Sequence, residues 1–249
     1  MSESQTVLVV GGTGRTGGRV LAQLLERGVE VRAIVRSPGK VPARVADNPH
    51  LNLIEADLLS LPDTELRRHV DGCVAVISCL GHVINFKGIF GPPHDLVARA
   101  TERLCRAAET LAPTTPIRFI LMSSVSVNRP NRADTRRGAF ERALLRVLCA
   151  LVPPAKDNQR AADYLIGRIG PSNPFVEWVA VRPDSLLEGD VTPYELHEGL
   201  VSSLFSPGST NMANVAHFMC ELATMDAAWS SWRGKLPVIV NSAKVGAAR

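Results

Sequence analysis

The chain has 249 residues, of which 45% are hydrophobic and 21% charged, so it is long enough to bury a sizeable core. Its net charge of +4, from 28 Lys plus Arg against 24 Asp plus Glu, is too small an excess to indicate a nucleic-acid partner. The five cysteines form no Cys-x-x-Cys pair, which argues against a disulfide framework or a zinc cluster. No signal sequence is visible, and no apolar run approaches the roughly 20 residues that span a bilayer. We therefore expect a cytoplasmic protein with no membrane and no nucleic-acid partner.

Short, β-branched apolar runs alternate with segments of helical periodicity along the chain. The runs predict strands over residues 6–10, 31–35, 51–56, 74–79, 117–123 and 175–181. Between them, helices are expected over residues 15–27, 63–70, 95–111 and 157–168. This alternation predicts an α/β fold with a doubly wound, mostly parallel sheet and helices on both of its faces.

One domain is expected over residues 1–249, with a core over 1–190 and a small C-terminal cap on the substrate side over 191–249. The strand–helix rhythm is interrupted over 124–156 and loosens after Pro183. In the cap, a helix is expected over 211–225 and a late strand over 235–241. Because ligands of open parallel sheets bind at the carboxyl ends of the strands, both irregular segments are well placed to shape a substrate pocket.

The stretch GGTGRTGG, residues 11–18, follows the first strand and opens the first helix. In that context its Gly12-x-Gly14-x-x-Gly17 pattern predicts a dinucleotide-binding loop rather than a flexible turn. Gly12 is expected to allow a sharp turn, Gly14 to leave room for a pyrophosphate, and Gly17 to let helix and strand pack closely. The pyrophosphate would then meet free N–H groups at the positive end of the helix dipole.

The residue that ends the second strand predicts which dinucleotide is bound. An NAD enzyme usually carries an acidic residue there, which accepts a hydrogen bond from the ribose 2′-hydroxyl. This chain has Arg36 instead, and Arg15 in the glycine loop is a candidate second cation. Because a guanidinium can hold a phosphate by two parallel hydrogen bonds, we expect NADP(H) in preference to NAD(H). The alternative is that both arginines are solvated surface residues.

The segment 7–37 resembles the short-chain dehydrogenase/reductase superfamily, and more narrowly its atypical, NmrA-like NAD(P)-binding branch. Further matches are EADLL (55–59), ISCLG (77–81), LMSSVSV (121–127) and VAVRPDSLL (179–187), so the resemblance covers about the first 190 residues. It implies a Rossmann-type fold, with Asp57 and Leu58 at the adenine, residues 79–81 at the nicotinamide-side ribose, and Ser123 and Pro183 at the nicotinamide end. The predicted cofactor-binding set is Gly11, Gly12, Thr13, Gly14, Arg15, Thr16, Gly17, Arg36, Asp57, Leu58, Cys79, Leu80, Gly81, Ser123 and Pro183.

The superfamily's hydride-transfer chemistry uses a serine with a Tyr-x-x-x-Lys pair, and that pair is missing from the sequence. Neither Tyr164 nor Tyr194 begins such a motif. Alignment with the atypical branch's usual Lys-x-x-x-Glu helix puts Gln159 at the lysine position and Asp163 at the glutamate position. The standard tyrosine site would then fall near Ala155.

Three other side chains are the candidate catalytic residues. By resemblance, Ser124 would polarise a carbonyl. Lys156 and His82 are possible proton donors or anion anchors, although Lys156 could equally be an ordinary exposed lysine and His82 a structural histidine.

Two functions remain open at this stage. The first is an NADP(H)-dependent reductase of a small carbonyl, quinone or enone-like substrate that works without the standard pair. The second is a non-catalytic NADP(H)-binding redox sensor or regulatory protein of the NmrA-like type. An arginine-rich stretch over 129–146 could contact a regulatory protein partner or an acidic substrate, or be solvated surface. The apolar helix candidate over 140–152 could form a homodimer seam, core or lid. No metal site is expected.

Overall fold

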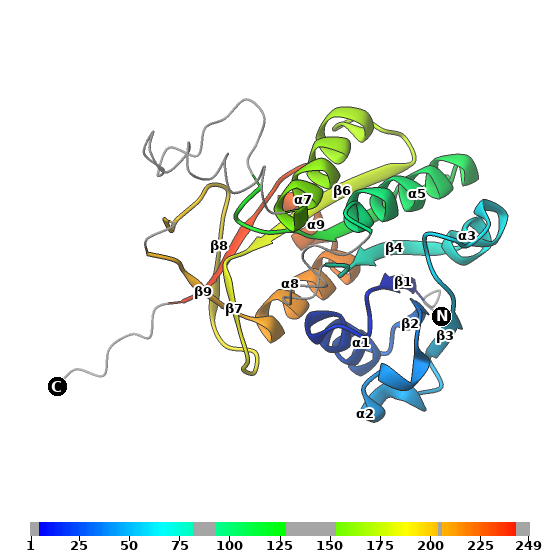
Figure 1. Ribbon diagram of the computed structural model, residues 1–249, viewed down its shortest axis with the longest axis horizontal. Coiled ribbons are helices and arrows are strands. Elements are labelled where there is room, and N and C mark those ends of the chain that lie inside the picture. The colour runs from blue at the N-terminus through cyan, green and yellow to red at the C-terminus, as the bar shows by residue number, and fades with distance from the viewer. Residues whose placement is uncertain (1–4, 82–92, 128–152, 204–205, 243–249) are drawn as a thin grey trace.

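The computed structural model describes residues 5–81, 93–127, 153–203 and 206–242 (Figure 1). The described strands are β1 (Thr6–Val10), β2 (Glu30–Val35), β3 (Leu51–Glu55), β4 (Cys73–Ser78), β5 (Ile117–Met122), β6 (Val176–Pro183), β7 (Ser185–Leu187), β8 (Tyr194–His197), β9 (Ser209–Asn211) and β10 (Val238–Asn241). The described α-helices are α1 (Arg15–Glu26), α2 (Ala43–Ala46), α3 (Asp63–Val70), α5 (Leu96–Leu111), α7 (Pro153–Tyr164), α8 (Met212–Thr224) and α9 (Asp226–Trp232).

Eight strands form one twisted sheet in the order β3-β2-β1-β4-β5-β6-β10-β8. All neighbours in it are parallel except β8, which runs antiparallel to β10 at one edge. The strand order reverses between β1 and β4, so the chain leaves these two adjacent strands in opposite directions. In sheets of this kind a crevice opens at that point, outside the carboxyl ends of the strands.

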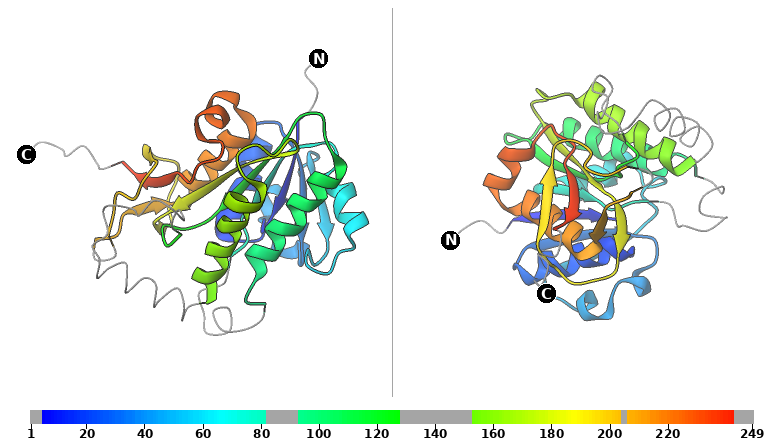
Figure 2. Two further views of the ribbon diagram at one scale, coloured as in Figure 1. Left: turned by 90° about the horizontal axis from the view of Figure 1, so that it is seen from above. Right: turned by 90° about the vertical axis from the view of Figure 1, so that its left-hand side faces the viewer.

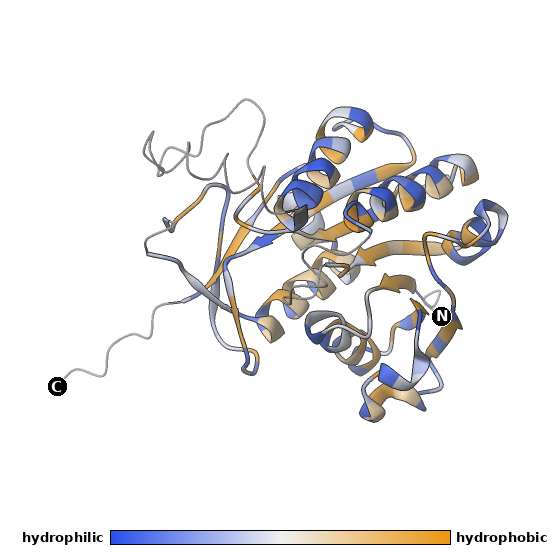
Figure 3. Ribbon diagram, viewed as in Figure 1, coloured by the Kyte–Doolittle hydropathy of each residue, from blue (hydrophilic) through white to orange (hydrophobic). Residues whose placement is uncertain are grey.

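Helices cover both faces of the sheet, and the two layers can be followed in Figure 2. Because successive side chains of a strand point to opposite faces, Val7 and Val9 of β1 pack with α1 and α8. Leu8 and Val10 pack with α3, α5 and α7 on the other face. Figure 3 shows the result, with hydrophobic residues along the strands and hydrophilic ones on the outward surfaces of the helices. The predicted doubly wound, mostly parallel sheet is confirmed.

The C-terminal elements were predicted to form a small cap, but two of them, α8 and β10, are part of the helix layer and of the main sheet. Helix α8 packs against α1, and β10 extends the sheet by pairing with β6. Nearly every residue of α8 is buried, which an amphipathic lid helix would not show. A two-stranded parallel sheet of β7 and β9 stands apart from the main sheet, at the carboxyl end of β6.

Helix α7 begins four residues before the predicted start, at Pro153. Proline is tolerated in the first turn of a helix because the N–H that it lacks would have no partner there. The helix continues into a π turn, Leu165–Ile169, and the chain leaves it at Gly170 with a φ of 69°. The predicted apolar helix over 140–152 and the arginine-rich stretch over 129–146 lie outside the described residues. None of the helices described is long and apolar enough to cross a membrane.

A buried carboxylate joins α7 to α5. Asp157 is fully buried, and its side chain accepts hydrogen bonds from the backbone N–H groups of Val97 (2.8 Å) and Ala98 (2.9 Å). These donors belong to the first turn of α5, where an intrahelical partner is lacking and a negative charge is favourable. Asp157 therefore sets how α5 begins, at the edge of the sheet where ligands bind.

The substitution Asp157→Ala should lower the free energy of unfolding by about 2 kcal/mol, because it leaves two buried N–H groups without their acceptor. Urea unfolding followed by circular dichroism measures the change. Asp163→Ala, on an exposed position of the same helix, is the matched control and should change stability little. Equal effects of the two substitutions would contradict the assigned role of Asp157.

Candidate cofactor-binding site

The glycine loop between β1 and α1 turns at Gly11, where φ is +80°. A Cβ atom on Gly11 would lie 2.6 Å from the carbonyl carbon of Cys79, so the loop runs directly against the end of β4. Gly12 lies in the turn itself, which is closed by a hydrogen bond from the N–H of Gly14 to the carbonyl oxygen of Gly11 at 3.0 Å, although the positive φ belongs to Gly11. The missing side chain of Gly12 also leaves room for Leu21, whose Cδ1 would stand 2.9 Å from a Cβ.

The other two glycines lie where the pattern predicted. A Cβ on Gly17 would lie 2.1 Å from the carbonyl oxygen of Gly11, so α1 can approach the loop this closely only with glycine at that position. A Cβ on Gly14 would meet only that same oxygen, at 3.2 Å, and its other side is open. The loop therefore presents bare backbone at Gly14, where a phosphate could approach.

The N-terminus of α1 offers hydrogen-bond donors without partners. Gly14 is the N-cap and supplies no side-chain cap. The backbone N–H groups of Arg15, Thr16 and Gly17 donate to no acceptor in the part of the chain that the structure describes. These donors and the helix dipole form an arrangement that favours an anion.

A pocket opens beside the glycine loop, between the ends of β1, β2 and β3 and the start of α5. It brings together six of the predicted cofactor-binding residues: Gly11, Thr13, Arg36, Asp57, Leu58 and Leu80. Its remaining lining was not predicted and is apolar: Val10, Ile34, Val35, Ala56, Leu59, Pro93 and Leu96. An apolar slot with a few polar groups suits a flat aromatic ring such as a purine. The sequence could have indicated Val10, Val35 and Ala56 as pocket residues, because they lie at the ends of predicted strands. No local sequence pattern marks Pro93 and Leu96.

The floor of this pocket is the loop 57–61, which is held in place from two sides. Asp57 accepts a hydrogen bond from the N–H of Leu59 (2.9 Å), which shapes the turn. Arg103 of α5 donates to the carbonyl oxygens of Leu58, at 2.6 Å, and of Leu61. Leu58 is buried, so the loop offers an apolar surface backed by fixed hydrogen bonds.

On the opposite side of the crevice, the chain that follows β5 continues to pair with β6. The N–H of Ser123 donates to the carbonyl oxygen of Val181 (2.7 Å), and that of Val125 to Pro183 (3.2 Å). The predicted residues Ser123 and Pro183 are thereby brought together. Ser123 is only 7% exposed, and its hydroxyl has no hydrogen-bond partner among the residues that the structure describes. A buried hydroxyl without a partner is costly, so its presence here fits a site in which a ligand supplies the partner.

Ser124 lies in a turn that is held by a buried arginine. Its Oγ accepts from the N–H and the hydroxyl of Ser126, both at 3.2 Å. The carbonyl of Val127, at the end of this turn, accepts from Arg182 at 3.0 Å. Arg182 is fully buried and also donates to the carbonyl of Leu236. The position of Ser124 is therefore set by the sheet itself.

Of the other two predicted catalytic residues, the structure describes Lys156, which does not line the pocket beside the glycine loop. Lys156 is exposed in the first turns of α7 and makes no hydrogen bond or ion pair within the described ranges. His82 lies outside the described residues. Gln159 and Asp163, at the positions of the atypical branch's Lys-x-x-x-Glu, are hydrogen bonded to each other at 2.9 Å.

Cys79 and Gly81 follow β4 at the centre of the crevice. The N–H of Cys79 donates to the carbonyl of Val10 at 2.9 Å, which fixes it against the glycine loop. Burial raises the pKa of the Cys79 thiol far above its usual range, and the neighbouring Cys220 raises it further. Cys79 is therefore a neutral packing residue with no thiolate to offer as a nucleophile. Gly81 is exposed.

Arg15, the predicted second cation, has a partner that the sequence did not indicate. Its guanidinium lies 3.6 Å from the carboxylate of Glu188, which follows β7. Arg19, one turn further along α1, pairs with the same carboxylate and donates to the carbonyl of Arg15. Glu188 thus brings a negative charge close to the N-terminus of α1, where the cofactor phosphates are predicted.

A family model described as NAD(P)H-binding matches residues 11–226, from the glycine loop to the start of α9. The chain belongs to this NAD(P)H-binding family. It is also 34% identical over 217 residues to an uncharacterized chloroplastic protein of Arabidopsis thaliana, a match that covers 84% of this chain and 75% of that protein.

Solved structures share the fold of this NAD(P)H-binding chain. An oxidoreductase from Lactococcus lactis is 21% identical with a TM-score of 0.69, over 95% of this chain and 91% of that one. A short-chain dehydrogenase/reductase from Veillonella parvula in complex with NADP is 13% identical with a TM-score of 0.65, over 96% and 95% of the two chains. A Rossmann-fold NAD(P)-binding protein from Shigella flexneri is 17% identical with a TM-score of 0.66, over 99% and 98%. The predicted Rossmann-type fold and the predicted membership of an NAD(P)-binding family are confirmed.

The substitution Glu188→Gln should strengthen NADPH binding about two- to fivefold, because it removes a negative charge near the predicted phosphates and releases Arg15. Titration of the protein with NADPH, followed by nucleotide fluorescence, measures the change. Glu195→Gln removes another exposed carboxylate, on β8, and is the matched control. Weaker binding in the Glu188 variant would mean that this carboxylate supports the loop instead of opposing the cofactor.

Proposed function

We propose that this NAD(P)H-binding chain is an NADP(H)-dependent oxidoreductase that reduces a small carbonyl, quinone or enone-like substrate. Arg36 carries the proposal. It is exposed at the rim of the pocket beside the glycine loop, directly after β2, where an NAD enzyme usually places a carboxylate. Among the described residues it has no ion pair or hydrogen bond, so its guanidinium is available to a 2′-phosphate.

The remaining residues fit the rest of such a cofactor. The bare backbone at Gly14 and the free N–H groups of α1 suit a pyrophosphate, and the apolar slot above Leu58 suits an adenine. The unpartnered hydroxyl of Ser123 supports a polar group of the cofactor or substrate at the other end. When bound, the dinucleotide supplies a hydride through its nicotinamide ring.

The chain's own contribution to chemistry is proposed to be orientation and polarisation. Ser124, held by its turn, would donate a hydrogen bond to the carbonyl oxygen of the substrate. No tyrosine stands near Ala155, so the proton needed after hydride transfer would come from water or from the substrate. The cytoplasmic location, a homodimer and a regulatory protein partner stay predictions from the sequence.

Calorimetric titration with NADPH and NADH tests the cofactor choice. We expect NADPH to bind at least about tenfold more tightly than NADH, since a hydrogen bond to a charged group contributes about 1.5–3 kcal/mol. Arg36→Asp should abolish that preference. Arg44→Asp, an exposed arginine on α2 outside the pocket, makes the same charge change and should leave the preference intact. Equal affinities of the unsubstituted protein for NADPH and NADH would contradict the NADP(H) assignment.

Turnover separates the reductase from the non-catalytic sensor. Oxidation of NADPH in the presence of a panel of quinones, enones and small aldehydes should be detectable, and Ser124→Ala should slow it without weakening NADPH binding. Different affinities for the oxidised and reduced cofactors, with no turnover of any substrate class, would favour the redox-sensing alternative.

A further inference from the structure

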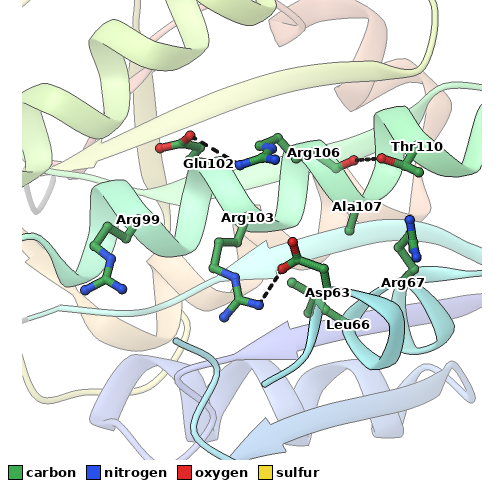
Figure 4. Close-up of a pocket in the computed structure, with 9 residues that line it drawn as sticks. All are labelled: Asp63, Leu66, Arg67, Arg99, Glu102, Arg103, Arg106, Ala107 and Thr110. Carbon is green, nitrogen blue, oxygen red and sulfur yellow. Dashed lines mark hydrogen bonds and ion pairs between the residues drawn. The ribbon is translucent and has the colours of Figure 1, made fainter. Parts of the chain in front are cut away.

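A second concave site lies away from the crevice, between α3 and α5 (Figure 4). We call it the arginine groove. It has a volume of about 330 Å³, in the range of small-molecule sites. None of the predicted cofactor-binding residues lines it. Its lining is Asp63, Leu66, Arg67, Arg99, Glu102, Arg103, Arg106, Ala107 and Thr110.

The groove gathers cations from both helices. Arg99, Arg103 and Arg106 follow one another at helical spacing on α5, so their side chains form a row along one wall. Arg67 faces them from α3. Two carboxylates, Asp63 and Glu102, are the acidic side chains of the lining. Four guanidinium groups minus two carboxylates leave a net charge of +2 in the groove.

One of these charges is fixed. The side chain of Arg103 is only 17% exposed, and it bonds to Asp63 at 2.6 Å as well as to the two carbonyls of the loop 57–61. A guanidinium held by three partners cannot turn away when a ligand approaches. It forms a permanent positive wall of the groove.

The other three charges are available. Arg106 and Arg99, with side chains 64% and 50% exposed, each reach a carboxylate of their own helix only at 3.8 Å. Exposed ion pairs of this kind contribute about 0–1 kcal/mol and exchange readily for a stronger partner. Arg67 has no ion pair or hydrogen bond within the ranges that the structure describes.

The groove has a positive electrostatic field. Arg103 lowers the pKa of the Asp63 carboxyl, chiefly by its hydrogen bond, and the charges of Arg106 and Arg67 lower it further. Figure 4 shows Arg103 against Asp63, Arg67 beside Ala107, and Arg106 beside Glu102. An anion that enters the groove would therefore lie among guanidinium groups from both helices.

The floor of the groove is apolar. Leu66 of α3 and Ala107 of α5 are 1% and 6% exposed and lie between the arginines. Both side chains are already covered by the protein, so the surface that the groove offers to a ligand is chiefly that of its charged side chains. A phosphate monoester carries a charge of about −1.5 to −2 at neutral pH, which matches the net charge of the groove. Arginine forks bind its oxygens by parallel hydrogen bonds.

We propose that the arginine groove is a binding site for a phosphate monoester, supplied by a small phosphorylated metabolite. Its lining residues are separate from those of the cofactor pocket. The loop 57–61 is shared by both, since Arg103 holds it from the groove side and it forms the floor of the adenine-side pocket.

Phenyl phosphate is the probe, and isothermal titration calorimetry is the measurement. The protein should bind one equivalent, and Arg67→Gln combined with Arg106→Gln should weaken binding at least about tenfold, because two hydrogen bonds to a charged group are lost. Arg168→Gln is a closely matched control, because its side chain is 63% exposed and pairs with a glutamate at 3.4 Å, but lies outside the groove. It should leave binding unchanged.

Arg36→Gln separates this site from the cofactor site. If phenyl phosphate occupies the groove, this variant binds it as tightly as the unsubstituted protein, whether or not NADPH binds at all. Loss of binding in Arg36→Gln alone would place the probe in the cofactor site and overturn the proposal. So would an unchanged affinity in the double variant, or no binding by the unsubstituted protein.

Two further ligands identify the source of the phosphate. Benzoate, which has the same ring with a single negative charge, should bind at least about tenfold more weakly than phenyl phosphate, since it engages fewer guanidinium groups. If a phosphoserine peptide binds through Arg67 and Arg106 but phenyl phosphate does not, the ligand is a phosphorylated protein. That result would overturn the proposal of a small metabolite. Circular dichroism of each variant establishes that the fold is retained.

Discussion

The close approach of three backbone segments at the glycine loop is the constraint on which the site depends. The carbonyl of Gly11 lies where a Cβ on Gly17 would stand, and the end of β4 lies where a Cβ on Gly11 would stand. Any side chain at either position would push α1 or β4 away from β1. Their proximity places the free N–H groups of α1 beside Cys79 and Leu80, at the point where the strand order reverses. A loop of ordinary residues could connect the same strand and helix, but not at this distance.

Charged side chains in or near the interior hold the loops around that point. Asp157 fixes the first turn of α5, Arg103 fixes the loop 57–61, and Arg182 fixes the turn that carries Ser124. Each of them bonds to backbone groups that a loop or helix end leaves without partners. Burying a charge is costly unless it is fully hydrogen bonded, so these residues specify single loop conformations more than they add stability.

The arginines lie in two regions that favour anions, and these regions differ in how their charges are balanced. At the crevice, Arg36 is the cation among the described residues that line the pocket, and Arg15 is partly neutralised by Glu188. In the arginine groove, cations from two helices outnumber the carboxylates, and one of them is locked in place. Arg103 touches both regions, because the loop that it anchors forms the floor of the adenine-side pocket. A change of charge in the groove therefore bears directly on the backbone that supports the cofactor pocket.

The sequence by itself determined the alternation of strands and helices, the glycine loop and its place between β1 and α1, and the residues that end the strands. These features are local, because periodicity and backbone freedom are read over a few neighbouring residues. It indicated the turn at Gly12, and the structure adds that the preceding Gly11 takes the positive φ, at a position where the backbone of Cys79 leaves no room for a Cβ. Only the tertiary structure brought Pro93 and Leu96 to the pocket, Glu188 to Arg15, and Asp63 to Arg103. These pairs are far apart in the chain or lie on different elements, and the packing of helices onto the sheet, which no short segment encodes, makes them neighbours.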